Sequence, residues 1–298
     1  MDRPDEWKPA APPAPTPPLN VRPRQLSVSR IETLIRDPYS IYARYILRLS
    51  PLDPLDAGLD ARERGNWIHK VLSEIGANWP DLDEQETARL LSRTARAELK
   101  FISGAPETKA VLMSRFDRLA PWFASENKKL LKGVSKSFAE IDGEIRWMSP
   151  GGEFILNARA DRIDLYEDGR ISIYDYKTGT APSAKQEQRG FSPQLLLEGA
   201  IALTGGFSSE RSLQSDINHL AYIELAGRQP PGKIKYIAED DPGGESLQAL
   251  DRLKIMIEKF DDETRPYFSR PHPTFTSRYG DYDQLARVQE WSSGENRQ

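Results

Sequence analysis

The spacing of hydrophobic and polar residues changes once along the chain, from a helical to an alternating pattern. From residue 26 to about 131, apolar residues recur every three or four positions, which predicts helices with breaks at Pro38, at 51–60 and near Pro106. From Val134 onward, apolar and polar residues alternate, as in strands with one buried face. The pattern therefore predicts a helical part at 26–133 and a part built on a sheet at 134–298.

The second part is predicted to mix strands and helices. Asp168-Gly169 is a hairpin signal between the second and third strands, and Ser192-Pro193 is expected to start a helix with Ser192 as its N-cap. Predicted strands are 137–147, 153–166, 170–176, 217–225 and 233–238, and predicted helices are 193–203 and 244–260. The chain is therefore expected to be α/β.

Residues 1–25 are rich in proline, which cannot continue a helix or a central strand. We expect this segment to be a disordered linker, with a ligand for a proline-binding module as the alternative. A linker at the start of the chain suggests that the chain is part of a longer polypeptide. Order is expected from Leu26, with Ser29 as the first helix N-cap.

Composition restricts the chemistry. The 298 residues contain no cysteine, which excludes disulfides, thiolate zinc sites and cysteine-bound iron–sulfur clusters. A formal net charge of -4 argues against a globally basic surface that grips duplex DNA, although a local basic groove is compatible with it. No apolar run is long enough to span a membrane, and no signal peptide is evident, so we expect a soluble, cytoplasmic protein.

The strongest chemical signal is the end of the third predicted strand. The run Ile173-Tyr174 continues into Asp175, Tyr176 and Lys177, and the predicted hairpin brings Asp161, fourteen positions upstream, close to Asp175. Two carboxylates beside a lysine can hold a hard divalent cation such as Mg²⁺ and place a base or a charge stabiliser beside a scissile phosphate. A strand-end salt bridge between Asp175 and Lys177 is the structural alternative.

Other polar residues allow two interpretations each. His69, which follows Gly65 by one helical turn, is either a core residue or a metal ligand. Glu140 is either an additional acid near the metal or a member of a cross-strand charge pair. Gln194, in the first turn of its helix, either faces the strand ends or only starts the helix. For Asp164 we expect a structural or supporting role.

In order along the chain, Gly65-Asn66-Trp67-Ile68-His69, Ala160-Asp161-Arg162-Ile163-Asp164, Asp175-Tyr176-Lys177-Thr178-Gly179 and Gln194-Leu195 resemble the RecB-like branch of the PD-(D/E)XK nuclease superfamily. The flanking Asp37-Pro38-Tyr39, Pro193 to Glu198 and Tyr279 to Tyr282 resemble the C-terminal nuclease domain of the AddB family in its alphaproteobacterial form. The resemblance implies a restriction-endonuclease-like mixed central sheet flanked by helices, with an N-terminal helical subdomain and 26–298 forming one nuclease domain.

The resemblance also implies roles for individual residues. His69, Asp161 and Asp175 would bind Mg²⁺ or Mn²⁺ together with the main-chain carbonyl of Tyr176. Lys177 would be the catalytic lysine, and Gln194 would orient the phosphate or the water, so that Asp161, Asp175, Lys177 and Gln194 form the catalytic set. Many related nucleases bind an iron–sulfur cluster through four cysteines, and this chain has none, so no cluster is expected.

The implied function is that of a Mg²⁺-dependent DNA nuclease domain in a helicase–nuclease subunit for double-strand break repair and recombination. Its substrate would be a single strand unwound from a broken DNA end, and its partner would be an AddA-type helicase–nuclease subunit in the bacterial cytoplasm. Two alternatives remain at this point. One is a catalytically inactive module of the same fold that guides DNA and docks the partner, and the other is a stand-alone RecB-like nuclease.

Overall fold

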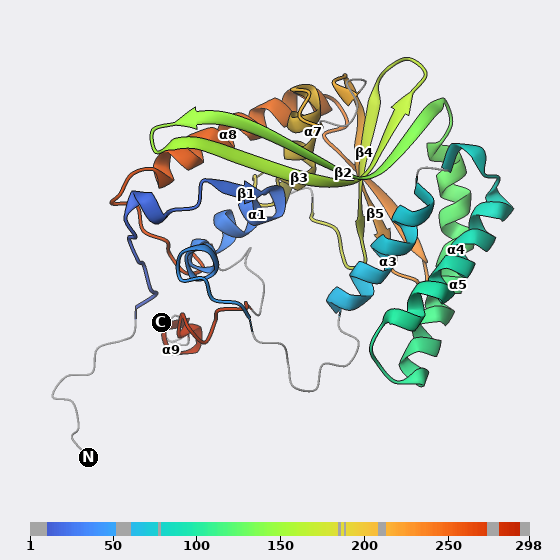
Figure 1. The fold of residues 1–298 in the computed structure, drawn as a ribbon, viewed down its shortest axis with the longest axis horizontal. Helices are drawn as coiled ribbons and strands as arrows, with labels where there is room; N and C mark the ends of the chain where they lie inside the picture. The colour runs from blue at the N-terminus through green and yellow to red at the C-terminus, as the bar shows by residue number, and fades with distance from the viewer. Residues whose placement is uncertain are drawn as a thin grey trace.

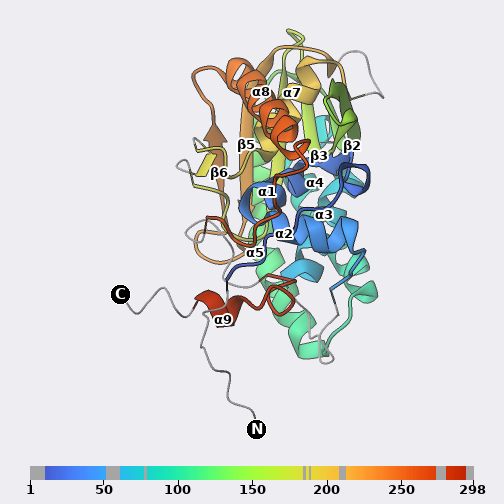
Figure 2. The ribbon, with the colours of Figure 1, turned by 90° about the vertical axis from the view of Figure 1, so that its left-hand side faces the viewer.

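The computed structural model describes residues 11–51, 61–76, 79–183, 186–187, 189–207, 213–272 and 280–292. They form a mixed six-stranded sheet with helices on both faces (Figures 1 and 2). The strands are β1 (Gln25–Ser27), β2 (Val134–Ser149), β3 (Gly152–Tyr166), β4 (Ile171–Lys177), β5 (Ile217–Leu225) and β6 (Gly232–Ile237). The helices are α1 (Val28–Arg36), α2 (Pro38–Ile41), α3 (Ala61–Gly76), α4 (Glu84–Glu98), α5 (Pro106–Leu130), α7 (Gln194–Leu203), α8 (Pro242–Phe260) and α9 (Val288–Ser292). This confirms the predicted α/β class and the mixed central sheet flanked by helices.

The long strand β3 joins the two halves of the sheet. Along one edge it pairs with β2 in antiparallel fashion, from Ser149↔Gly152 to Val134↔Tyr166. Its other edge is shared, because β1 pairs in parallel with 155–157 and β4 pairs in antiparallel fashion with 162–165. The sheet then continues from β4 to a parallel β5 and an antiparallel β6.

The two faces of the sheet are covered by different helices, and each face has its own hydrophobic core. Ile171 and Ile173 of β4 face a core that includes residues of α1, α7 and α8. The alternate residues Tyr174 and Tyr176 face a second core that includes residues of α3, α4 and α5. Because β4 is covered on both faces, it is apolar at nearly every position until Asp175.

Local sequence explains where several helices begin. Asp83 and Glu86 form a reciprocal capping box at the start of α4, and Pro106 occupies the first turn of α5. The structure corrects two predicted caps. The N-cap of α1 is Ser27, whose side chain accepts a hydrogen bond from Arg30 N, and Ser29 lies inside the helix. Helix α7 begins at Gln194 after Pro193, and Ser192 instead contacts the side chain of Arg36.

The structure also corrects the expectation that residues 11–25 are a disordered linker. The backbone amides of Tyr267 and Ser269 donate hydrogen bonds to the carbonyls of Pro15 (2.8 Å) and Pro13 (3.1 Å). Proline-rich backbone has few donors of its own, but its carbonyls are free to accept. The composition therefore does not show that this segment packs on the rest of the chain. Residues 1–10 lie outside the described residues.

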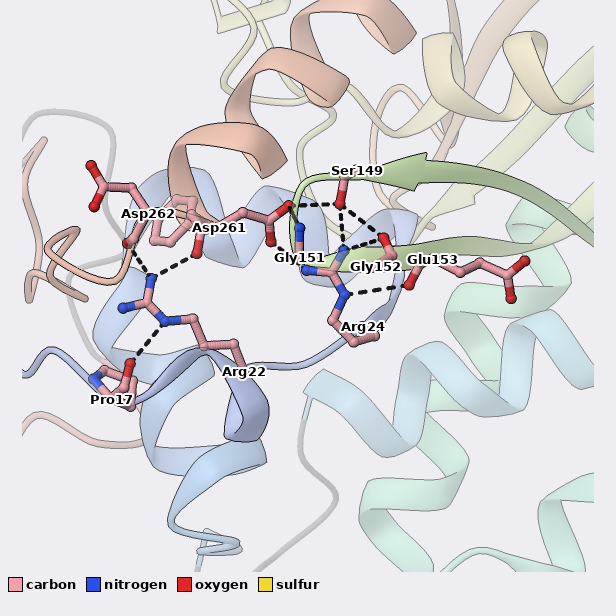
Figure 3. Close-up of polar contacts among 10 residues, drawn as sticks. Pro17, Arg22, Arg24, Ser149, Gly151, Gly152, Glu153, Asp261 and Asp262 are labelled. Atoms are coloured by element: carbon pink, nitrogen blue, oxygen red, sulfur yellow. Dashed lines mark hydrogen bonds and ion pairs between the residues drawn. The ribbon is translucent and has the colours of Figure 1, made fainter.

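Two arginines anchor this N-terminal segment (Figure 3). The buried Arg22 guanidinium donates to the carbonyl of Pro17 (2.9 Å) and to three carbonyls at the C-terminal end of α8 and just beyond it, those of Phe260 (2.6 Å), Asp262 (2.8 Å) and Glu263 (2.8 Å). Arg24 forms an ion pair with Asp261, whose other carboxylate oxygen accepts from the β2–β3 turn at Ser149 Oγ (2.6 Å) and Gly151 N (3.0 Å). The segment is thus tied to both α8 and the β2–β3 turn.

Among the described helices, none has the length and apolar composition needed to cross a membrane.

Candidate active site

The β3–β4 hairpin brings Asp161 and Asp175 together, as predicted. The turn closes through a hydrogen bond from Gly169 N to Tyr166 O (3.0 Å), and Gly169 has φ +85°, a conformation that glycine adopts without strain. In the register of the hairpin, Arg162 of β3 lies opposite Tyr174 of β4. The neighbouring Asp161 therefore lies beside the end of β4. One oxygen of Asp161, Oδ2, accepts a hydrogen bond from Tyr176 N (2.8 Å).

Helix α3 supplies His69 to this hairpin. His69 Nδ1 lies 3.1 Å from Asp161 Oδ1, so the two oxygens of Asp161 contact β4 and α3. One turn earlier, a Cβ on Gly65 would lie 3.4 Å from Thr178 Oγ1, so glycine allows α3 to lie close to the loop after β4. Burial alone would lower the pKa of His69, but the hydrogen bond and charge of Asp161 raise it above its ordinary value.

Glu140 on β2 completes a group of possible metal ligands. Ligand atoms of His69, Glu140 and Asp161 all lie within 4.8 Å of one another. Glu140 has φ +54°, an uncommon backbone conformation for glutamate, and lies between the β2–β3 pairs Ala139↔Arg162 and Ile141↔Ala160. Its carboxylate also forms an ion pair with Arg159 on the adjacent strand (2.7 Å). Glu140 is therefore both an acid within the group of possible metal ligands and a member of a cross-strand charge pair, the two alternatives that the sequence left open. Burial, and then the charge of Asp161, raise the pKa of Glu140.

The second group of polar residues surrounds Lys177. Lys177 Nζ lies 2.8 Å from Asp175 Oδ2 and 3.1 Å from Asp175 Oδ1, and it donates a hydrogen bond to Gln194 Oε1 (3.0 Å). The Gln194 amide nitrogen in turn donates to Asp175 Oδ1 (2.5 Å). The structure thus brings three of the predicted residues into one hydrogen-bonded group, in which Asp175 contacts Lys177 rather than the His69 group.

The charges of this second group follow from burial. Burial raises the pKa of Asp175 to about 6, although the charge of Lys177 opposes the rise. Burial would lower the pKa of Lys177, but Asp175 outweighs it, and the pKa of Lys177 lies above its ordinary value. The side chain of Asp175 is 5% exposed and that of Lys177 is 30% exposed, so the ammonium group is the part that can reach a substrate.

Glu198 is a further residue of this group whose role the sequence does not predict. It lies one turn after Gln194 on α7, is 1% exposed, and accepts a hydrogen bond from Gln194 Nε2 (3.2 Å). Burial, and then the charge of Asp175, hold the pKa of Glu198 well above its ordinary value, which favours the neutral acid form of this side chain. A glutamate within an otherwise apolar helical run is the signal that could have indicated it.

Asp164 has the structural role expected of it. Its two oxygens accept hydrogen bonds from Arg162 Nε (2.8 Å) and Nη2 (2.6 Å), and Ser137 Oγ also donates to it (2.6 Å). Arg162 reaches Asn127 Oδ1 on α5 as well (2.6 Å). Both charged side chains are almost completely buried, which is compatible with stability because each is fully paired.

The first group and Lys177 of the second group line one cavity of about 690 Å³, with His69, Glu140 and Asp161 among its lining residues. Two carboxylates and an imidazole within 4.8 Å of one another suit a divalent cation that takes oxygen and nitrogen ligands. The residues therefore fit a metal ion of the expected kind. A lysine held beside such a site can stabilise negative charge that develops on a phosphate.

Residues 25–274 match a family model described as the PD-(D/E)XK nuclease superfamily. A Rickettsia bellii protein is 34% identical over 190 residues, which cover 64% of this chain and 23% of that protein. A Rickettsia conorii protein is 29% identical over 294 residues, which cover 89% of this chain and 34% of that protein. A Clostridium perfringens protein, named as a subunit of an ATP-dependent helicase/deoxyribonuclease, is 27% identical over 246 residues, which cover 73% of this chain and 19% of that protein.

The chain thus spans 34% or less of the length of each of these three relatives. Among solved structures, one from Eubacterium rectale aligns with 90% of this chain and 95% of that chain, at 10% identity and a TM-score of 0.48.

Proposed function

The chain belongs to the PD-(D/E)XK nuclease superfamily, and on that premise we propose that it hydrolyses phosphodiester bonds of DNA in the presence of Mg²⁺ or Mn²⁺. The observation that carries this proposal is the position of Lys177. Its ammonium group is held by Asp175 and Gln194 and lines the same cavity as His69, Glu140 and Asp161. A group of metal ligands and a fixed cation beside one cavity suit metal-assisted hydrolysis of a phosphodiester.

The side chains have distinct roles in this proposal. His69, Asp161 and Glu140 would hold the metal ion, with Asp175 and the Tyr176 carbonyl as further ligands. A bound divalent ion supplies positive charge to the phosphate and lowers the pKa of a water molecule. Lys177 stays protonated because its pKa is raised, so it stabilises the charge of the transition state rather than removing a proton.

Gln194 is proposed to be the residue that positions this lysine. Its amide oxygen accepts from Lys177 and its amide nitrogen donates to Asp175 and Glu198, which fixes the orientation of the amide. Because α7 carries Gln194 in its first turn, the helix places this side chain at the ends of the strands.

At the level of the whole protein, we propose that the chain is the nuclease domain of a helicase–nuclease subunit that acts in double-strand break repair and recombination. The similarity to a subunit of a Clostridium perfringens ATP-dependent helicase/deoxyribonuclease supports this role. The partner would be an AddA-type subunit in the bacterial cytoplasm, and the substrate an unwound single strand. The net charge of -4 also favours a domain that receives its strand from a partner over one that captures duplex DNA by itself.

The test is cleavage of end-labelled DNA as a single strand and as a blunt duplex of the same sequence. Reactions contain Mg²⁺, Mn²⁺ or EDTA, with and without ATP and an AddA-type subunit whose own nuclease site has been inactivated. We expect the single strand to be cut with either metal and not in EDTA, and the duplex to be cut only when the helicase partner unwinds it. Cutting that persists in EDTA would contradict the metal-dependent mechanism. A failure to cut with both metals and the partner present would favour the inactive module.

A further inference from the structure

We propose that a second cavity, between α3, α5 and the loops that follow β4 and β5, is a subsite for the nucleotide next to the one that is cut. This inference rests on the proposed nuclease function and adds the path that the DNA strand takes. The cavity has a volume of about 290 Å³. Its two helices lie on the same face of the sheet (Figure 1).

The floor of this cavity is apolar and rigid. It is formed by buried side chains of the second core, from two helices: Trp67, Ile68, Leu112, Phe116 and Leu119. The rings of Trp67 and Phe116 lie 5.0 Å apart and pack against each other. An apolar floor with aromatic rings is a suitable surface for a nucleobase.

Three arginines from three different elements line the same cavity. Arg64 comes from α3, Arg115 from α5 and Arg228 from the loop after β5. Among the described residues, none of the three guanidinium groups has a hydrogen-bond or ion-pair partner, and Arg115 and Arg228 are exposed. Arginine donates in a planar, forked arrangement that matches phosphate oxygens. A cluster of unpaired arginines above an apolar floor therefore fits the phosphate and base of a nucleotide.

The single acidic side chain that lines this cavity is already engaged. Glu224 Oε1 accepts a hydrogen bond from the backbone amide of Ala181 (2.9 Å). The balance of charge around the cavity is therefore positive although the whole chain carries a net charge of -4. Local charge of this kind attracts a phosphate backbone independently of net charge.

The loop after β4 connects this cavity to the candidate active site. Thr178 and Gly179 line both cavities, and they directly follow Lys177. A strand with its scissile phosphate beside Lys177 can therefore extend over Thr178 and Gly179 toward the arginines. Such a path fixes the neighbouring nucleotide while the cut phosphate lies near the metal group.

The wall formed by the loop after β5 is held close to α5. Gly227 has φ +62°, and a Cβ there would lie 3.1 Å from Arg115 Cβ and from the Arg115 carbonyl oxygen. Arg118 Nη2 donates to Gly227 O (3.2 Å), and Gly227 N donates to Pro231 O (2.8 Å). These contacts keep Arg228 on the rim of the cavity.

The test is equilibrium binding of a fluorescein-labelled twelve-nucleotide thymidine strand, measured by fluorescence anisotropy in EDTA at several salt concentrations. The full chain is compared with Arg64→Ala, Arg115→Ala, Arg228→Ala and the triple variant. Arg93→Ala is the matched control, because Arg93 is exposed on α4, does not line the cavity and has no partner among the described residues. Thermal unfolding establishes that each variant is folded.

Each single substitution is expected to raise Kd about threefold to tenfold. The triple variant no longer neutralises the phosphate of this nucleotide, so its slope of log K against log salt should fall by about 0.7, and Arg93→Ala should bind like the unmodified chain. Arginine variants that bind with the Kd and slope of Arg93→Ala would overturn the subsite. An abasic strand that binds as tightly as the thymidine strand would overturn the base contact.

Because binding is measured without metal, the result is independent of cleavage. Lost affinity in the arginine variants together with no cleavage by the unmodified chain would uphold the subsite and reject the nuclease activity. Cleavage by the unmodified chain together with unchanged binding in the variants would uphold the nuclease activity and reject the subsite.

Discussion

At the scale of the residue, the central feature is a lysine that remains charged in a largely buried setting. Asp175 and Gln194 surround the ammonium group of Lys177, and the pKa of Lys177 is raised despite burial. An unpaired lysine at such a position would tend to lose its proton. Asp175 therefore keeps Lys177 protonated, which is the form that the proposed mechanism needs beside a phosphate.

Metal binding is expected to weaken as the pH falls through about 6. Burial raises the pKa of Asp175 to about 6, and the pKa of His69 is also above its ordinary value. Since ligands bind a cation in their deprotonated forms, protons compete with the metal at a higher pH than for ordinary aspartate. Titration of Mn²⁺ by calorimetry between pH 5 and pH 8 measures this. An affinity that does not change across this range would contradict the ligand assignment.

Glu198→Gln is expected to retain most of the activity, whereas Glu198→Ala should lower the cleavage rate about threefold to tenfold. A neutral acid and an amide offer Gln194 the same acceptor oxygen, while alanine removes it, and a hydrogen bond of this kind contributes about 1 kcal/mol. Single-turnover cleavage at saturating metal checks the prediction. Equal rates in the two variants would show that Glu198 does not position Gln194.

The sequence predicts some of the site residues better than others. Asp161, Asp175 and Lys177 follow from a hairpin signal and from charges at the end of a buried strand, and the structure places them together. The sequence does not decide the role of Glu140, because its position depends on a left-handed backbone conformation that hydrophobic alternation does not encode. It does not decide the role of Glu198 either, because the effect of this residue depends on burial against Asp175, which only the folded chain shows.

At the scale of the element, periodicity predicts five of the six described strands and most described helices, but it predicts neighbouring strands only where a turn signal joins them. The alternation of β3 and the Asp168-Gly169 turn are sufficient to predict its hairpin with β4. The pairing of β1 with β3 is not predictable in this way, because residues 25–27 are a short strand with few apolar positions. The proline-rich pattern before β1 likewise gives no indication that Arg22 is buried.

Arg22→Ala is expected to reduce the free energy of unfolding by about 3 kcal/mol, because it removes charge-assisted hydrogen bonds to four carbonyls and leaves buried acceptors unpaired. Arg22→Lys should not restore stability, since an ammonium cannot reproduce the forked geometry. Urea unfolding measures the free energy of unfolding of both Arg22 variants, with Arg93→Ala as a control at an exposed position. A loss below about 0.5 kcal/mol would show that the N-terminal segment contributes little to the fold.

At the scale of the whole molecule, the candidate site lies where the two helical layers meet the ends of the strands. His69 comes from α3, whose apolar side belongs to one core, and Gln194 comes from α7, which belongs to the other. Asp161 and Asp175 lie on the sheet between them. Because the site residues, which are spread from position 69 to position 198, come from both layers, the site requires both cores to be folded.

The charge distribution of the whole molecule is consistent with delivery of a strand by a partner. The chain is acidic overall, and Arg64, Arg115 and Arg228, which have no ion-pair partner in the described part of the chain, gather around one cavity beside the candidate site. A small local cluster of positive charge attracts the phosphates of a strand that lies next to it. The net negative charge of the chain disfavours long-range capture of duplex DNA from solution.

The most direct test of the central claim is the rate at which the chain cuts a labelled single strand with Mg²⁺, compared with the rate of Lys177→Ala. The variant should fold, as judged by circular dichroism, and should cut at least about a hundredfold more slowly, because it lacks the charge that stabilises the transition state. Arg93→Ala, purified in the same way, should cut at the unmodified rate. Equal cutting by the unmodified chain and a folded Lys177→Ala would contradict the proposed site.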